Sequence, residues 1–226
     1  MPNENTRFHQ PFRVNVGCGA SPIAGWRNFD NSTSLLLARI PFSDTLLRAT
    51  RLISETQASY IAFARNNEVE FANATIRLPL PDASAEVVYT SHMLEHLDRH
   101  DVQRFLAEMR RILQPGGVLR ISVPDLRQIA EAYLENGDAD RFVEGTMMAG
   151  ERPRGVAGKL KALLIGPRHH LWMFDGPSLA ALLRRNGFVD VSEISAGETR
   201  ITNPGPLDLH ERETGSVCVE AEKART

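Results

Sequence analysis

The sequence has little of several features that would place it in a specialised class of protein. It holds only two cysteines, Cys18 and Cys218, in 226 residues. Their wide separation does not suit a metal motif, so we expect two free thiols in a reducing compartment, the cytoplasm. No apolar run approaches the roughly 18 residues of a membrane span, and the polar first ten residues show no secretory signal. The net charge of −2 gives no basic footprint for nucleic acid.

What the chain does contain is typical of a globular protein. Hydrophobic residues make up 42% and charged residues 24%, which are ordinary proportions. A chain of this length suits one well-cored domain. We therefore expect an N-terminal tail over residues 1–11 and a single domain over residues 12–226.

Short β-branched runs alternate with amphipathic stretches along the domain. Strands are predicted at residues 12–16, 26–30, 69–72, 86–90, 118–123, 188–194 and 216–222, and helices at 44–64, 101–113, 126–134 and 178–186. This alternation indicates an α/β fold around a largely parallel sheet. We expect a helical cover at about residues 35–66 and a substrate-side segment at about 138–175.

Two glycines and an aspartate follow the first two predicted strands. Gly17 and Gly19 allow the backbone to approach a ligand closely, although a tight turn without a ligand would also use them. Asp30 can accept hydrogen bonds from the hydroxyls of a ribose. It comes only eleven residues after Gly19, and a third glycine is missing. This spacing disfavours a dinucleotide and suits a nucleoside without phosphates. Asn73, after the third strand, can contact an adenine edge.

The fourth strand ends in a cluster of polar residues. His92, Glu95 and His96 follow it directly, and Asp125 follows the fifth strand. If a helix begins after Ser91, His92 and His96 lie on one side of it. Histidine is suited to proton transfer near neutral pH, so the cluster is a candidate for acid–base chemistry. Each of these residues could instead be a capping or solvated side chain.

Several of these segments together resemble the class I S-adenosylmethionine-dependent methyltransferases, in particular the small methyltransferase domains of the type-11 kind. The similar pieces include Val-Asn-Val-Gly-Cys-Gly at residues 14–19, Gly-Trp-Arg-Asn-Phe-Asp at 25–30, Leu-Pro-Leu-Pro-Asp at 78–82, Leu-Glu-His-Leu at 94–97, Leu-Gln-Pro-Gly-Gly at 113–117, Val-Pro-Asp-Leu at 123–126 and His-Leu-Trp-Met-Phe-Asp at 170–175. The resemblance implies a Rossmann-like, doubly wound sheet of seven strands whose last strand is antiparallel.

The resemblance also implies the cofactor and its contacts. Gly17 and Gly19 would pass beneath the methionine part of S-adenosylmethionine, and Asp30 would hold its ribose. Further members of the expected cofactor site are Asn15, Cys18, Asn31, Asn73, Ala74, Ser91 and His92. Many members of the group have aspartate where this chain has Asn73, and residues 35–70 are longer than in its short members.

The expected reaction is methyl transfer to a hydroxyl of a sugar, oligosaccharide or comparable metabolite. His96 is the first candidate for the base, and the other candidate catalytic residues are His92, Asp125 and His170. We expect a small-molecule or glycan acceptor and no nucleic-acid partner, and a homodimer stays open. No metal site is assigned, although a divalent ion such as Mg²⁺ assisting the transfer stays open.

Other functions stay open beside this one. They are N- or C-methylation of a small molecule, a non-catalytic protein that binds the same cofactor, and a zinc hydrolase that uses His92-x-x-Glu95-His96. A short-chain dehydrogenase is disfavoured, because no tyrosine is followed four residues later by lysine.

Overall fold

The fold is built on one seven-stranded sheet. The computed structural model describes residues 11–49, 53–150, 169–210 and 214–225. The strands lie in the order β3-β2-β1-β4-β5-β7-β6. Only β7 runs antiparallel to its neighbours, β5 and β6, which confirms the predicted fold class. The strands are β1 (Phe12–Val16), β2 (Arg27–Asp30), β3 (Glu70–Phe71), β4 (Ala85–Ser91), β5 (Leu113–Pro124), β6 (Phe188–Ile194) and β7 (Ser216–Lys223).

Apolar residues on both faces of the central strands explain why the sheet is covered on each side. Along β4, Val88 belongs to the large core cluster, whereas Val87 and Tyr89 pack in a second cluster with Trp26 and Ile201. The alternation follows the two-residue period of a strand. The predicted strand thus lies at the centre of the molecule and delivers its last residues to the edge of the sheet.

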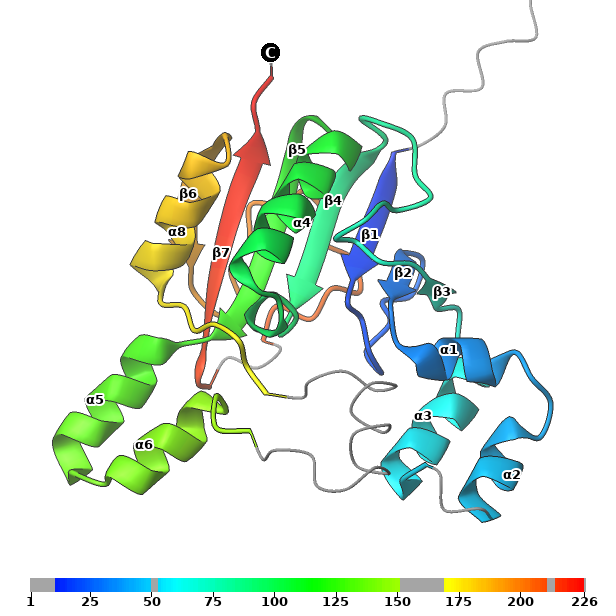
Figure 1. Cartoon of the computed structure of the whole chain (residues 1–226). Helices are drawn as coiled ribbons and strands as arrows, with labels where there is room; N and C mark the ends of the chain where they lie inside the picture. Colours follow the sequence, from blue (N-terminus) through cyan, green and yellow to red (C-terminus); the bar gives the residue numbers. More distant parts are fainter. Residues whose placement is uncertain (1–10, 50–52, 151–168, 211–213, 226) are drawn as a thin grey trace, which may run out of the picture.

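Helices α4 (Arg99–Ile112) and α8 (Gly176–Arg185) cover one face of the sheet (Figure 1). The predicted apolar face of α4 is buried at Val102, Phe105, Leu106, Met109 and Ile112. Helices α5 (Leu126–Asn136) and α6 (Ala139–Thr146) extend from the edge where the parallel strands end. No helix in the described part of the chain is long and apolar enough to cross a membrane.

The stretch between β2 and β3 differs from the single helix predicted over residues 44–64. It holds α1 (Thr33–Ala38), α2 (Ser43–Ala49) and α3 (Glu55–Asn66). The start of α3 is fixed by a capping box, in which Ser54 and Gln57 each bond the other's backbone N–H. Serine followed three residues later by glutamine is a sequence signal for this helix start.

The order of the strands places a switch point between β1 and β4. From β1 the chain goes to β2 and β3 on one side and then returns to β4 on the other. In open α/β sheets, ligands bind outside the carboxyl ends of the strands at this point. The predicted glycines and His92 follow strands that end there, and Asp30 is the last residue of such a strand.

Candidate functional site

The loop after β1 brings two glycines to the switch point for different reasons. Gly17 has φ of +69°, and a Cβ added to it would lie 2.5 Å from Cγ of Met93. Gly19 has φ of +49°, but nothing lies within 4 Å of the place of its Cβ. The side of Gly17 is therefore filled by protein, whereas the side of Gly19 is open. No helix separates β1 from β2, which confirms that the usual phosphate-binding helix is absent.

Asp30 ends β2 beside this loop and orders it. Its Oδ2 accepts from the Gly19 amide at 3.0 Å, and its Oδ1 accepts from the Ser32 amide at 2.7 Å. The phenol of Tyr60 on α3 donates to the Gly19 carbonyl at 3.2 Å. Burial, and secondly the charge of Asp30, raise the pKa of Tyr60, so its hydroxyl stays protonated. The helical stretch thus reaches the predicted ribose position through Tyr60, a residue that the sequence pattern did not single out.

Two of the predicted cofactor residues have structural partners within the loop. The Asn15 amide is buried and donates to the Ser21 carbonyl at 3.0 Å and to Asn28 Oδ1 at 3.2 Å. Burial raises the pKa of the Cys18 thiol to about 12, with a further contribution from Asp30. Both cysteines are free, as predicted. Asn15 and Cys18 therefore shape the loop from inside.

The predicted adenine residues follow β3. Asn73 Oδ1 accepts from the Thr75 amide at 2.9 Å and from its hydroxyl at 2.8 Å, which leaves the side-chain NH₂ group to meet a ligand. Ala74 is buried, and Asn31 is exposed between β2 and α1. These three residues lie on the β2 and β3 side of the loop.

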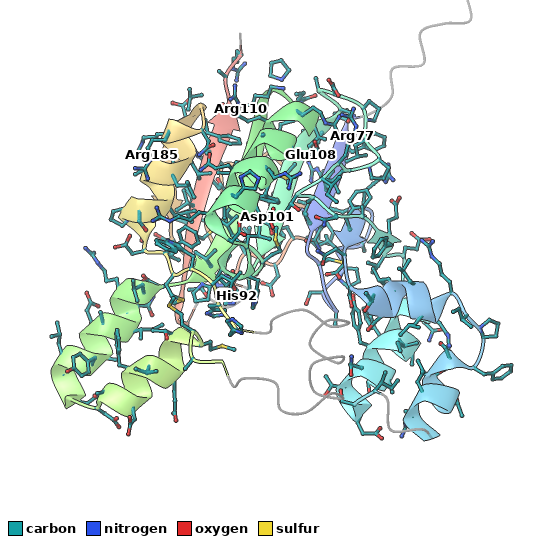
Figure 2. The ribbon with its side chains drawn as sticks, in the orientation of Figure 1. Arg77, His92, Asp101, Glu108, Arg110 and Arg185 are labelled. Carbon is teal, nitrogen blue, oxygen red and sulfur yellow. The ribbon has the colours of Figure 1, made fainter. Side chains whose placement is uncertain are left out.

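The cluster after β4 is not arranged on a helix as predicted. β4 continues to Ser91, and only Leu94–His96 form one turn of 3₁₀ helix. His92 has φ of +49°, a strained value for a residue other than glycine, and its amide donates to the Ser122 carbonyl. The two histidines therefore do not share one helix side. Figure 2 shows His92 where β4 ends, below α4.

The histidines instead surround the carboxylate of Glu95, whose side chain is only 1% exposed. Its Oε1 lies 3.6 Å from Nδ1 of His92, 3.9 Å from Nε2 of His96 and 3.9 Å from Nε2 of His170. The rings of His96 and His170 meet edge to face, with centroids 5.0 Å apart. Glu95, which the sequence suggested only for the zinc-hydrolase alternative, is the centre of this cluster.

Backbone carbonyls fix which nitrogen of two rings carries the proton. Nδ1 of His170 lies 2.8 Å from the Thr146 carbonyl, and Nδ1 of His96 lies 3.4 Å from the His169 carbonyl. A carbonyl only accepts, so Nδ1 is protonated in both rings and Nε2 carries a lone pair. Burial lowers the pKa of both histidines below the ordinary 6.5. Both imidazoles are therefore neutral at neutral pH.

Three predicted residues have surroundings that differ from the expectation. The Asp125 carboxylate caps α5 through the Arg127 amide and accepts from the Gln128 side chain, so helix capping accounts for it. The Ser91 hydroxyl is enclosed and has no hydrogen-bond partner among the described residues. His170, a candidate catalytic residue, is 4% exposed and its ring packs against that of His96.

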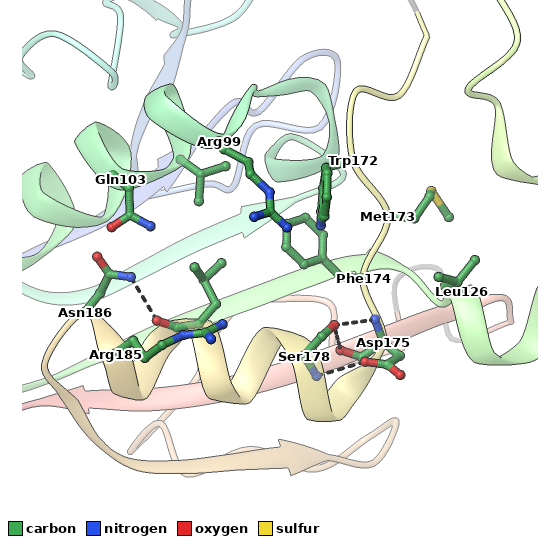
Figure 3. A pocket seen from close by; sticks show the side chains of 12 residues that line it. Arg99, Gln103, Leu126, Trp172, Met173, Phe174, Asp175, Ser178, Arg185 and Asn186 are labelled. Carbon is green, nitrogen blue, oxygen red and sulfur yellow. Dashed lines mark hydrogen bonds between the residues drawn. The ribbon is translucent and has the colours of Figure 1, made fainter.

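A separate groove of about 620 Å³ lies between α4 and α8. Figure 3 shows Arg99 and Gln103 on one side, with Trp172 beside Arg99, and Ser178 and Arg185 on the other side. The Arg99 guanidinium lies 3.8 Å from the centre of the Trp172 ring. The groove lies on the face of the sheet that α4 and α8 cover, and its lining residues include neither Asp30 nor the glycines of the β1 loop. It is therefore distinct from the switch point.

Comparison with known proteins relates this arrangement to a protein family. Residues 14–121 match the family model of a methyltransferase domain. These residues include the loop after β1, Asp30 and the cluster after β4. This stretch, a little under half of the chain, is therefore similar to a methyltransferase domain, and the match supports a class I S-adenosylmethionine-dependent methyltransferase.

Curated relatives match parts of this chain. A probable S-adenosylmethionine-dependent methyltransferase of Mycolicibacterium smegmatis is 41% identical over 63 residues, which are 27% of this chain and 24% of the relative. A trans-aconitate 2-methyltransferase of Azoarcus sp. is 30% identical over 113 residues, covering 49% of this chain and 38% of the relative. The first of these matches thus spans about a quarter of its relative's length.

Solved structures share the fold of the methyltransferase domain over nearly the whole chain. A protein of Methanosarcina mazei described as a SAM-dependent methyltransferase has a TM-score of 0.53 at 16% identity, covering 96% of this chain and 94% of that one. A possible histamine N-methyltransferase of Thermotoga maritima has a TM-score of 0.52 at 18% identity, covering 96% and 84%. At these identities the likeness concerns the fold alone.

Proposed function

We propose that this protein transfers a methyl group from S-adenosylmethionine to a hydroxyl oxygen of a small molecule. The observation that carries the proposal is the open space at Gly19 beside the Asp30 carboxylate. Both lie at the switch point of the sheet, within the matched methyltransferase domain. When bound, the cofactor supplies a methyl group already activated by its sulfonium, so the protein mainly positions the acceptor.

The residues around this space suit a nucleoside. Each oxygen of Asp30 accepts one backbone N–H, and a carboxylate oxygen has a second lone-pair site for a ribose hydroxyl. The Asn73 NH₂ group can donate to an adenine nitrogen. Gly19 lets the chain pass close to the ligand where a side chain would intrude. We assign Asp30 and Gly19 the main contacts and Asn15 and Cys18 a positioning role.

The neutral imidazoles after β4 support an oxygen acceptor. A hydroxyl that is methylated must lose its proton, and a neutral histidine can receive it. His96 is the most exposed member, at 37% of its side chain, whereas His92 is 19% exposed. We therefore propose that His96 receives the proton of the acceptor hydroxyl, and that the acceptor is a sugar, an oligosaccharide or a comparable metabolite.

A carboxylate acceptor is the second candidate. Two curated relatives are named trans-aconitate 2-methyltransferase, and that name gives a carboxylic acid as substrate. A carboxylate is already deprotonated at neutral pH, so its methylation needs no base. The two candidates therefore differ in whether turnover depends on His96. A cytoplasmic location and a homodimer stay predictions.

Two glycine variants test the proposal. Gly19 and Gly25 both have positive φ, and nothing lies within 4 Å of either added Cβ. Gly19→Ala and Gly25→Ala should therefore destabilise the fold similarly, but only Gly19→Ala should weaken S-adenosylmethionine binding in calorimetry. Equal affinity in both variants would contradict the placement of the cofactor.

Turnover is then measured with a panel of sugars, hydroxylated metabolites and carboxylic acids, with S-adenosylhomocysteine release as the readout. We expect methylated product from a hydroxyl acceptor, and a lower kcat with unchanged cofactor affinity in His96→Asn. Cofactor binding without product from any acceptor would favour the non-catalytic alternative. Product from a carboxylic acid that His96→Asn does not affect would favour the second candidate.

A further inference from the structure

The cluster around Glu95 has the composition of a metal site. Among the described residues, one ligand atom each from Glu95, His96 and His170 lie within 4.8 Å of one another. Glu95 and His170 are buried, and His96 is partly exposed. An imidazole pair with one carboxylate is a common ligand set for a catalytic zinc or iron ion.

The orientation of the two imidazoles is that of metal ligands. A histidine that binds a metal usually donates its other ring N–H to a carbonyl or carboxylate, which fixes the ring and its tautomer. His170 does so to the Thr146 carbonyl and His96 to the His169 carbonyl. As a result, the Nε2 lone pairs of both rings face the carboxylate of Glu95.

We propose that Glu95, His96 and His170 bind one divalent transition-metal ion, with Zn²⁺ as the best fit. Bond lengths of about 2.0–2.2 Å place two tetrahedral ligands about 3.4 Å apart. Both Nε2 atoms are now 3.9 Å from Glu95 Oε1, so a small movement inward closes the site. Three protein ligands leave a coordination position open.

The fold holds the two halves of this site together. Glu95 and His96 belong to the turn after β4, whereas His170 comes from the segment before α8. The Leu171 and Trp172 amides donate to the Glu95 carbonyl at 2.8 and 3.2 Å. The His170 amide donates to the Met147 carbonyl at 2.9 Å, at the end of α6. These backbone bonds position the ligands before any ion arrives.

This arrangement differs from the zinc-hydrolase alternative. That signature uses His92 and His96 as ligands and Glu95 as the base. Here Glu95 is one of the three grouped ligands and His92 is outside the group. The Nε2 of His92 lies 2.8 Å from the Ser216 hydroxyl, and its Nδ1 faces Glu95. His92 is thus a neighbour of the proposed ligand set.

The role of the ion rests on the function proposed above. Met93, between His92 and the turn, packs against Gly17, so the ion site adjoins the cofactor loop. His96 is the exposed ligand, and an ion there would present its open position toward an acceptor. With the ion bound, Nε2 of His96 is a ligand and no longer a free base. The ion would then lower the pKa of the acceptor hydroxyl, whose proton would pass to solvent before the oxygen takes the methyl group from the sulfonium.

Metal content tests the site independently of methyl transfer. Untagged full-length protein is dialysed, incubated with ZnCl₂ and measured by elemental mass spectrometry and calorimetry. We expect about one Zn²⁺ per chain in the wild type and in the control His100→Asn, whose histidine is exposed on α4. Glu95→Gln and His170→Asn should weaken Zn²⁺ binding by more than the about 10–100-fold that a second-shell change produces.

Two further readouts keep the result clear if a variant folds poorly. In the wild type alone, Tm should rise on adding one equivalent of Zn²⁺ and fall with a chelator, and Co²⁺ should give a visible absorption band that His96→Asn alters. Absence of Zn²⁺ binding by the wild type, or equal binding in folded His170→Asn, would overturn the proposal. S-adenosylmethionine binding in the same samples reports on the proposed function separately.

Discussion

Replacing Gly17 by alanine should destabilise the fold for two separable reasons. A residue other than glycine at φ of +69° costs about 1–2 kcal/mol. The new Cβ would also lie 2.5 Å from Cγ and 2.8 Å from Cβ of Met93, and overpacking of this kind costs about 1–3 kcal/mol. The sum of about 2–5 kcal/mol is a large part of the stability of an ordinary domain, about 5–15 kcal/mol.

Gly25→Ala is the matched control, since Gly25 has φ of +75° and no neighbour within 4 Å of its added Cβ. It should lose only the conformational part, about 1–2 kcal/mol. Urea denaturation of the two variants measures the difference. Met93→Ala introduced into the Gly17→Ala protein should recover some of the packing part, because it removes the Cγ at 2.5 Å but keeps the Cβ at 2.8 Å. If Gly17→Ala is no less stable than Gly25→Ala, the contact between Gly17 and Met93 does not constrain this loop.

Two more predictions concern a buried ion pair and the pH dependence of stability. Arg120→Met should destabilise the fold by up to about 3–5 kcal/mol, because the fully buried Glu220 loses the buried partner bonded to it at 2.6 Å. Glu220 keeps the Arg200 guanidinium at 3.6 Å and hydrogen bonds from the Thr199 hydroxyl and the Arg200 amide. The double variant Arg120→Met/Glu220→Leu should recover part of this loss in urea denaturation, and a loss below 1 kcal/mol in Arg120→Met would refute the reasoning. Burial holds the pKa values of His96 and His170 in the folded protein below 6.5. As the pH falls, these histidines are therefore protonated in the unfolded chain before they are protonated in the folded one, so stability should fall as pH drops below about 6.5. His170→Asn should flatten this dependence between pH 7.5 and 5, and an unchanged slope of stability against pH would contradict the prediction.

The sheet and its ligand edge could be predicted because strand signals and strand ends are local. Val87, Val88 and Tyr89 are consecutive apolar residues, which is typical of a strand buried on both faces, and they pack alternately in the two core clusters. The glycines follow β1 and Asp30 ends β2, so their convergence follows from a parallel sheet. The antiparallel position of β7 came from the family resemblance and not from the residue pattern.

The arrangement of the histidine cluster could not be predicted, because it depends on contacts between distant segments. His170 reaches Glu95 only because two backbone amides beside it bond the Glu95 carbonyl. His92, between β4 and this turn, has a left-handed backbone conformation, which the sequence pattern did not indicate. The helix boundary at Ser54 was predictable from its capping box but lay within a longer apolar pattern.

The most direct test of the account is a crystal structure of the protein grown with S-adenosylhomocysteine. We predict that the nucleoside lies beside Gly19, with its ribose hydroxyls on the Asp30 carboxylate and its sulfur directed toward the turn after β4. A nucleoside bound instead in the groove between α4 and α8, beside Trp172, would contradict the account.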